Sequence, residues 1–420
     1  MNVRARAWRP RADTTSGGRP LPLTGVRVLD LGQVFQGPYA GFLMAMAGAD
    51  VIKIEPPHGD MSRRRARDGD YPFRALNGCK RGIVIDLKTA PGRQLLIELA
   101  KTADVLVENF SPGVMTRLGL GPEVLLDVNP RLIYGSGSGF GNSGPYAHKR
   151  ALDLTIQAMS GLMSTTGEKG GAPLRAGVPV ADFMSGAHLY GAIMTALFER
   201  ERTGKGRVVE VSMLEAMFAP LVPSAGHAYT SGEPPQRCGN RHVADSYVPF
   251  DTFEAKDGWI AIVCATDDHW LKLCGAMDRP DLAADPSLRT LQGRIERIDD
   301  VTAIIAGWTC RRTREEASAV CEKHHVPAAP LRDVTEVLED PHLHERGFLT
   351  DVETEAGRVA LPNSPMRYAG SALRALSPPP ELGQHTYEVL RDLVGLADPG
   401  LAELDRIGVT APAPKGVPAT

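Results

Sequence analysis

Short apolar segments alternate with helical segments over the first half of the chain. Each segment that we interpret as a buried strand is brief, apolar and rich in β-branched residues. The predicted strands are 26–31, 50–55, 81–86, 104–108, 131–136 and 207–211. Helices are expected between them, at 39–48, at 91–102, from Ser111 onward and at 187–202. This alternation predicts an α/β fold built on a doubly wound parallel sheet with right-handed crossovers.

The pattern changes after residue 219. The segment 220–246 is rich in Pro, Gly and Ser and is interpreted as a linker. A smaller α+β domain is predicted over 247–330, from two strands about a turn at 256–258 and helices near 268–276, 291–307 and 313–324. The remaining segment, 331–408, is expected to return as a linker and to complete the large domain begun by 21–219.

Composition narrows the function classes. The chain is 43% hydrophobic and 23% charged, as soluble globular proteins are, and its net charge of −3 argues against general nucleic-acid binding. No apolar run reaches the roughly 20 residues needed to cross a bilayer. Six scattered cysteines without a CxxC pair indicate reduced thiols, so we expect a cytoplasmic protein without nucleic-acid or membrane partners.

Both ends of the chain are expected to be disordered tails, at 1–20 and 409–420. The first tail carries five arginines without the apolar core of a secretory signal. A transit peptide is the alternative interpretation of that composition, because such peptides are rich in arginine and poor in acidic residues.

Two motifs have the spacing of a cofactor or metal site without its context. Gly139 to Gly144 matches GxGxxG, but Pro145 follows and no helix opens there, which disfavours a nicotinamide cofactor. A ligand-facing loop at the carboxyl end of a strand fits this stretch better. The histidines at 324–325 and at 342 and 344 lack acidic or cysteine neighbours at metal-site spacing, so no metal is expected.

Asp182 is an acid between two apolar segments. It follows 177–181, which we interpret as a short strand, and precedes the helix predicted from Ala187. One interpretation is a helix N-cap, and the other is a catalytic carboxylate. Both remain open on the local pattern, because a helix N-terminus also keeps a carboxylate ionised.

Longer motifs in a fixed order resemble the class III CoA-transferases, the family of formyl-CoA transferase and the carnitine CoA-transferases. The resemblance covers roughly residues 22–395. Its carriers include LPLTGVRVLDLGQVFQGPYAG (21–41), GADVIKIEPPHGD (48–60), ADVLVENFSPGVMTRLGLG (103–121) and PVADFMSGAHLYGAIMTAL (179–197). The family implies a Rossmann-like large domain with a smaller inserted domain, and two chains interlocked as a homodimer.

The resemblance also implies the chemistry. The family's nucleophilic aspartate matches Asp182, which would carry CoA from an acyl-CoA thioester to a small carboxylic acid through an aspartyl-CoA intermediate. With an ordinary pKa near 4, that carboxylate would be ionised at neutral pH. CoA is a substrate here, and no permanently bound cofactor is implied. The family's CoA contacts match Val34, Ile85, Leu87, Lys88, Asn109, Arg117, Leu118 and Arg150.

Four further residues are candidates for the active site. Asp153 matches an acidic position near the reacting centre, and Gly139 lies in a loop whose backbone N–H groups suit an oxyanion. Gln33 and Gln36 are candidates for the pocket of the acceptor acid. Apart from these four, Arg241 and His242 could hold the second carboxylate of a dicarboxylic acid.

Departures from the family pattern narrow the activity. The segment 236–242 lacks the glycine run of formyl-CoA transferase, and Pro56 and Phe35 replace an arginine and a glutamine of that enzyme. Formyl-CoA and oxalate are therefore disfavoured as the specific substrates. An acyl-CoA racemase of the same family is the first alternative, but Leu152 stands where that branch has a histidine. A CoA-binding protein without catalysis is the second, and the retained Asp182 disfavours it.

Overall fold

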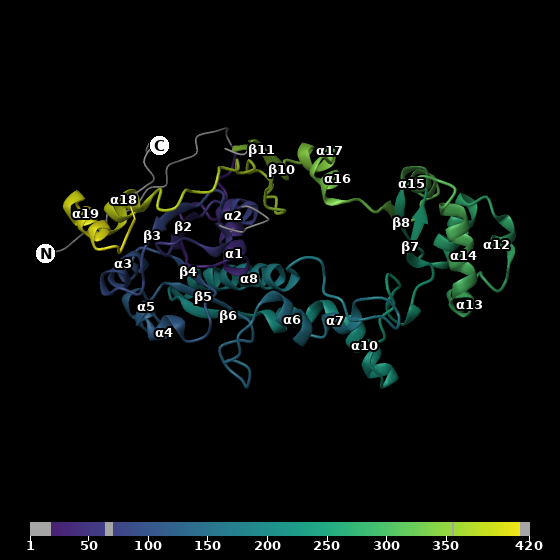
Figure 1. Ribbon diagram of the computed structural model, residues 1–420, viewed down its shortest axis with the longest axis horizontal. Coiled ribbons are helices and arrows are strands. Elements are labelled where there is room, and N and C mark those ends of the chain that lie inside the picture. Colours follow the sequence, from purple (N-terminus) through teal and green to yellow (C-terminus); the bar gives the residue numbers. More distant parts are fainter. Residues whose placement is uncertain (1–17, 64–69, 355–356, 412–420) are drawn as a thin grey trace. The chain divides into compact units, whose positions relative to one another are not determined.

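The computed structural model describes residues 18–63, 70–354 and 357–411 (Figure 1). These residues form two compact units. The first takes its residues from 1–156, 178–217 and 340–420, and the second from 157–177 and 218–339. The tails predicted to be disordered lie outside the described residues except for 18–20 and 409–411.

A six-stranded parallel sheet is the centre of the first unit. Its strands are β1 (Arg27–Asp30), β2 (Asp50–Glu55), β3 (Arg81–Val84), β4 (Val105–Glu108), β5 (Ile133–Ser138) and β6 (Arg207–Ser212). They lie in the order β3-β2-β1-β4-β5-β6, and every neighbouring pair is parallel. The predicted α/β fold is confirmed. Because the strand order reverses between β1 and β4, the carboxyl ends of these two strands form a switch point, where such sheets bind ligands.

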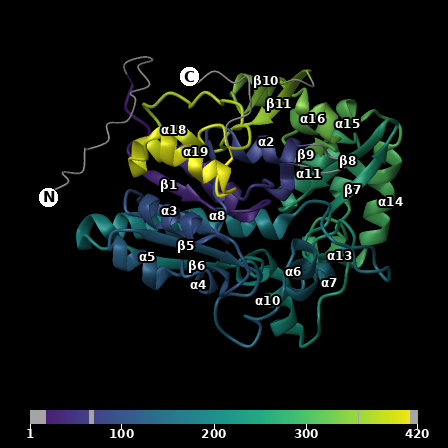
Figure 2. The same ribbon diagram turned by 60° about the vertical axis from the view of Figure 1, so that its left-hand side comes forward.

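Alternating residues of the strands pack on opposite faces of this sheet. Val28 joins a core with α1 (Gln36–Met46) and α8 (Val180–Thr203), whereas Leu29 joins a core with α3 (Ala90–Ala100). The second core also takes in the C-terminal segments α18 (Thr386–Val389), η4 (Leu390–Val394) and α19 (Asp398–Arg406), which are yellow in Figure 2.

Short elements complete the first unit. They are η1 (Met61–Arg63), α2 (Tyr71–Asn77), α4 (Val114–Arg117), α5 (Pro122–Val128), α6 (Asp153–Met159), α9 (Met213–Ala216), α17 (Pro341–Glu345) and the hairpin of β10 (Leu349–Thr354) and β11 (Gly357–Pro362). Most of α6 therefore belongs to the first unit, because that unit extends to Ile156. The predicted start of a helix at Ser111 corresponds to the single turn of α4.

The second unit has an antiparallel sheet and a core of its own around Trp270. The sheet contains β7 (Phe250–Ala255), β8 (Gly258–Val263) and β9 (Ala328–Pro330). Its helices are α7 (Leu162–Thr165), η2 (Ala219–Leu221), α10 (Val222–Ser231), η3 (Val243–Asp245), α11 (Asp267–Ala276), α12 (Pro280–Ala284), α13 (Leu291–Glu296), α14 (Ile298–Thr309), α15 (Arg314–Lys323) and α16 (Val334–Leu338).

Two expectations about this unit need correction. The segment 220–246 is not a plain linker, because its first part forms helix α10, which begins with Pro223 in its first turn and ends before Gly232. The helix expected over 291–307 is divided at Arg297, which lies between α13 and α14. Within the described part of the chain, no helix combines the length and the apolar composition that crossing a membrane requires.

Candidate active site

Asp182 lies inside the first turn of α8 rather than before it. The helix begins at Val180, seven residues earlier than expected, and its N-cap is Pro179, so the N-cap interpretation of Asp182 is wrong. The strand expected over 177–181 is also absent from the structure described for these residues. Pro179 explains the difference, since proline suits the start of a helix, where its missing backbone N–H group would have had no partner within the helix.

The N-terminus of α8 is instead capped by Asp153 from α6. The Asp153 carboxylate accepts hydrogen bonds from the backbone N–H groups of Ala181, at 2.8 Å, and Asp182, at 3.3 Å. These are among the N–H groups that a helix leaves without partners inside itself. The two acids that the sequence singled out are therefore brought together, and one holds the backbone of the other.

The carboxyl group of Asp182 is difficult to ionise. Burial raises its pKa, and the negative charge of Asp153 raises it further, to about 7. The expected ordinary pKa near 4 is therefore wrong, because these two effects outweigh the N-terminus of the helix. The neutral form of Asp182 is therefore favoured at neutral pH far more than that of an ordinary aspartate.

The N-terminal turns of α1 and α8 pack directly on each other. Phe183 contacts Tyr39 edge-on, with ring centroids 4.9 Å apart, and lies 5.8 Å from the ring of Phe35. A Cβ atom at Gly186 would come within 2.7 Å of the backbone oxygen of Gln36, so only glycine fits there. Asp182 consequently lies next to the turn that joins β1 to α1.

The structure brings Gln33 and Asn109 together at the switch point of the sheet. The Gln33 N–H group donates to Asn109 Oδ1 at 2.6 Å, and Asn109 Nδ2 donates to the Gln33 carbonyl oxygen at 3.0 Å. This pair connects the turns that follow β1 and β4. Val34, the next predicted CoA contact, has a φ of 63°, which is rare for a β-branched residue.

Gln36 and Gly139 are the other two candidates for the active site. Gln36 is buried, and its side chain packs on the backbone of Gly137 in β5. Its Nε2 atom is a buried group without a hydrogen-bond partner among the described residues. Gly139 lies against Ala151, since a Cβ atom added to it would overlap the Ala151 side chain, and its carbonyl oxygen accepts the Leu214 N–H group at 3.0 Å.

The remaining predicted CoA contacts are spread over several environments. Lys88 is exposed and lines a pocket of about 360 Å³ together with Pro56, Pro57, His58 and Asp86. Ile85 is fully buried, and Leu87 and Leu118 pack against the core. Arg117 and Arg150 are exposed. Three of the predicted contacts are therefore exposed cationic side chains, a type of group that binds phosphate, and one of them lines a pocket.

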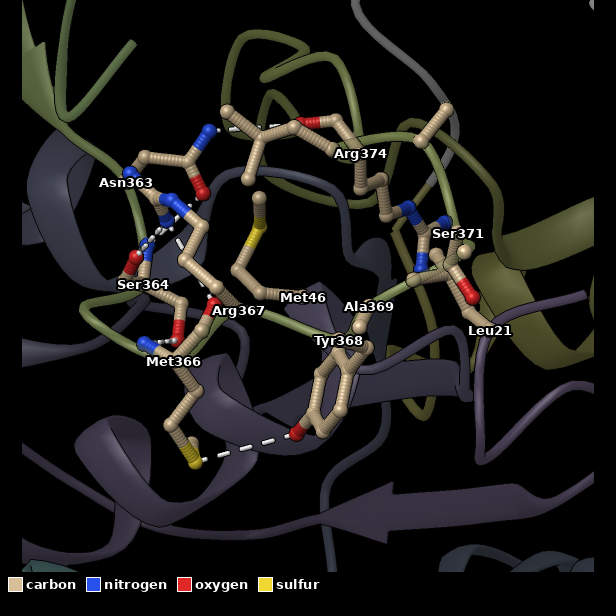
Figure 3. Close-up of a pocket in the computed structure, with 13 residues that line it drawn as sticks. Leu21, Met46, Asn363, Ser364, Met366, Arg367, Tyr368, Ala369, Ser371 and Arg374 are labelled. Atoms are coloured by element: carbon tan, nitrogen blue, oxygen red, sulfur yellow. Dashed lines mark hydrogen bonds between the residues drawn. The ribbon is translucent and has the colours of Figure 1, made fainter. Parts of the chain in front are cut away.

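A larger cavity lies away from these residues. It measures about 450 Å³ and is lined by residues of the segment 363–374 together with Leu21 and Met46 (Figure 3). Met46 is the last residue of α1, whereas Gln36, next to the Asp182 region, is the first. The cavity is thus at the opposite end of that helix and contains none of the predicted site residues.

Sequence reasoning missed Lys53 and Asp60, a buried ion pair below the β1–α1 turn, with nitrogen and oxygen 3.2 Å apart. The signal was a lysine between the apolar residues Ile52 and Ile54 of a predicted buried strand, because a buried lysine needs a charged partner. In the second unit, Arg241 is paired with Asp251 and Asp299. Among the residues that the structure describes, no cluster of three or more His, Cys, Asp or Glu side chains could hold a metal ion.

Comparison with known proteins decides the family. The family model of CoA-transferase family III matches residues 23–386. The chain belongs to this family. A family III CoA-transferase transfers CoA and takes CoA thioesters as substrates.

Individual relatives agree with this assignment. The chain is 36% identical to succinate–glutarate CoA-transferase of Agrobacterium fabrum, over 90% of this chain and 98% of the relative. It is 38% identical to acetyl-CoA:oxalate CoA-transferase of Acetobacter aceti, over 85% and 92% of the two chains. The crystal structure of a CAIB/BAIF family protein from Brucella suis superimposes with a TM-score of 0.80 at 34% identity, covering 89% of this chain and 100% of that one.

Proposed function

We propose that this family III CoA-transferase moves CoA from an acyl-CoA thioester to a free carboxylic acid through a covalent intermediate at Asp182. The observation that carries the proposal is the environment of this side chain. Asp182 is a largely buried carboxyl in the first turn of a long helix, with the backbone held by Asp153, beside the turn where a parallel sheet binds ligands.

The reaction needs neither a metal nor a redox step. An oxygen atom of ionised Asp182 attacks the thioester carbonyl, and CoA leaves as the thiolate, which gives a mixed anhydride. The thiolate then attacks the carbonyl carbon of Asp182, releases the donor acid and forms the aspartyl-CoA thioester. The acceptor carboxylate attacks this thioester, and the released thiolate attacks the acceptor carbonyl of the second anhydride. The product is a new acyl-CoA together with free Asp182 carboxylate.

Each tetrahedral step places negative charge on an oxygen atom. Backbone N–H groups of the glycine-rich stretch that contains Gly139, at the end of β5, are suitable donors to that oxygen. Asp153 is best described as a positioning residue, because it binds the backbone of Asp182 rather than the reacting atoms. Leu152 is 76% exposed and supplies no acid or base, which leaves the racemase alternative without a partner for Asp153.

A trapping experiment tests the covalent step. The enzyme is incubated with an acyl-CoA donor and then with hydroxylamine, and peptides are mapped by mass. We expect a hydroxamate on the peptide that contains Asp182, since both the anhydride and the thioester of this residue react with hydroxylamine. An unmodified Asp182 peptide after full consumption of the donor would argue for direct transfer. Loss of the α-proton in deuterated water without CoA transfer would favour the racemase.

The acids are proposed to be small dicarboxylic acids. The two relatives described above are named for succinate, glutarate and oxalate, and all three carry a second carboxylate. We expect a panel of acceptors to show kcat/KM higher for dicarboxylates than for monocarboxylates of equal length by at least about tenfold, roughly the contribution of one charge-assisted hydrogen bond. Equal kcat/KM for the two classes of acid would show that the enzyme does not recognise the second carboxylate.

The family resemblance and the cysteines lead to two further expectations, for the oligomeric state and for the cellular location. We expect a homodimer, as the family resemblance implies, and sedimentation of the purified protein at the mass of one chain would contradict it. All six cysteines are free thiols. A cytoplasmic location stays a prediction, and fractionation of cells tests it.

A further inference from the structure

The turn that joins β1 to α1 contains a backbone conformation that needs support. Val34 has a φ of 63°, in the left-handed region, where a β-branched side chain is unfavourable. Strain of this kind persists only where surrounding groups hold it, and it is concentrated at functional sites. Because Val34 lies only two residues before the start of α1, this single residue sets how the turn leaves the sheet.

Side chains from the neighbouring strand β2 and from the segment that follows it hold this turn. The Val34 N–H group donates to a carboxylate oxygen of Asp60 at 3.2 Å. The Lys53 ammonium donates to the carbonyl oxygen of Gly32 and to Asp60, the latter at 3.2 Å. Asp60 is itself fixed by the backbone N–H group of Ser62, at 2.8 Å, and by its hydroxyl, at 2.7 Å.

The second side of the turn is held by Asn109, whose amide binds both the N–H group and the carbonyl oxygen of Gln33. Backbone groups of Gly32, Gln33 and Val34 are therefore each bound by a side chain that comes from outside the turn. This arrangement leaves the turn little freedom to change shape.

The Lys53–Asp60 pair is not explained by stability. Lys53 is 1% and Asp60 3% exposed. A buried ion pair contributes little net stability, because desolvating both charges offsets their attraction, and apolar side chains of equal volume are often as good. The same two groups bind the Gly32 carbonyl oxygen and the Val34 N–H group, which apolar side chains could not do.

Both members of the pair stay ionised at neutral pH. Burial lowers the pKa of Lys53, but the charges of Asp30, Asp60 and Glu55 outweigh it and raise the pKa above its usual value. Burial raises the pKa of Asp60, but the Lys53 charge and the Ser62 hydrogen bonds outweigh it and lower the pKa.

We propose that Lys53 and Asp60 are positioning residues for CoA, which hold Val34 in the left-handed conformation in which the β1–α1 turn receives the coenzyme. The proposal rests on the proposed function and on the prediction, from the family resemblance, that Val34 contacts CoA. It predicts that the pair acts on the binding of CoA, through Val34, and much less on the chemical steps at Asp182.

The test is a double-mutant cycle on CoA affinity. In Asp60→Asn we expect the Kd for CoA and the KM for acyl-CoA to rise about tenfold or more, as when a residue supporting a direct ligand is changed, while kcat changes less than about threefold. Val34→Gly removes the strain that Asp60 opposes. In a Val34→Gly background, Asp60→Asn should therefore weaken CoA binding much less than it does in the native chain.

Two matched variants separate positioning from other effects. Asp50 is the first residue of β2, the strand that contains Lys53. Asp50→Asn breaks the ion pairs with Arg27 and Arg81 and should change thermal stability without changing CoA affinity. Lys88→Ala removes a proposed direct contact, so its effect on Kd should be the same in the native chain and in the Val34→Gly background. If Asp60→Asn does not fold, Ser62→Ala, which removes one hydrogen bond to Asp60, carries the same test with a smaller rise in Kd.

The outcomes are distinct. Unchanged Kd in Asp60→Asn, or an equal increase with and without the Val34 side chain, overturns the positioning proposal while leaving CoA transfer intact. A native protein that neither binds nor transfers CoA would instead overturn the proposed function.

Discussion

Replacing Asp182 by alanine is expected to lower CoA transfer by about 10⁴-fold or more, because the variant has no group to form the anhydride or the thioester. The measurement is the steady-state rate of acyl-CoA formation from a donor thioester and an acceptor acid. CoA affinity should change little, since the proposed CoA contacts lie on other elements. Hydroxylamine trapping on this variant should give no hydroxamate on the peptide that spans residue 182.

Asp182→Asn and Asp398→Ala are the controls for this loss. Asp398 is also an aspartate in the first turn of a helix, but it is exposed on α19, and its replacement should leave the rate within about twofold. Asp182→Asn keeps the shape of the side chain without its charge and should be as inactive as the alanine variant. Retention of more than a few per cent of the activity in either Asp182 variant would contradict covalent catalysis by this residue.

The stability of Asp182→Asn provides a second measurement with a defined sign. The pKa of Asp182 is about 7 in the folded chain, against about 3.9 in an unfolded one. The folded state therefore binds the proton more tightly, so native stability falls as pH rises between these values and stays lower above them. Asp182→Asn has no such loss, and its Tm at about pH 8 should exceed that of the native enzyme.

The strands of the sheet could be predicted from local patterns, but their order could not. All six strands of the large domain were recognisable, because each is a short segment rich in apolar β-branched residues, including the largely exposed edge strand β6. Their order, and hence the switch point between β1 and β4, depends on long-range pairing that no short segment encodes. The same limit applies to Asp153, whose position 29 residues before Asp182 gives no sign that it caps α8.

Local conformation was misjudged where proline and buried charge were involved. The apolar residues before Asp182 have the composition of a strand, yet Pro179 starts a helix there, which placed Asp182 inside the first turn. The pKa of Asp182 could not be foreseen either, because it depends on burial and on the charge of Asp153, both of which come from the tertiary structure. Lys53 could have been recognised as unusual, but its partner Asp60 could not.

The rate of transfer should depend on pH with a midpoint of about 7, the pKa of Asp182. Only the ionised carboxylate can attack the thioester, so kcat/KM for the donor should fall about tenfold for each pH unit below this value and level off above it. The profile is measured with a donor whose own carboxylates stay ionised over the range. A profile flat down to about pH 5 would show that Asp182 is already ionised in the free enzyme.

Asp153→Asn tests the cause of this midpoint. The amide oxygen of asparagine can still accept the hydrogen bonds from Ala181 and Asp182, but the negative charge that raises the pKa of Asp182 is gone. We therefore expect the midpoint of the acid limb, the part of the pH–rate profile where kcat/KM falls with falling pH, to move to lower pH. It should not reach the pKa of an ordinary aspartate, because burial, the larger cause, remains. At about pH 6 the variant should keep a larger fraction of its own plateau rate than the native enzyme does.

Asp398→Asn, in which an exposed aspartate is changed, should leave the limb where it is. An unmoved limb in Asp153→Asn would mean that the charge of Asp153 does not reach Asp182. A plateau rate lowered without any shift of the limb would leave Asp153 with a role in backbone positioning alone. The direction of the shift thus separates the two contributions that one carboxylate makes to its neighbour, the hydrogen bonds to the start of α8 and the charge that opposes ionisation of the nucleophile.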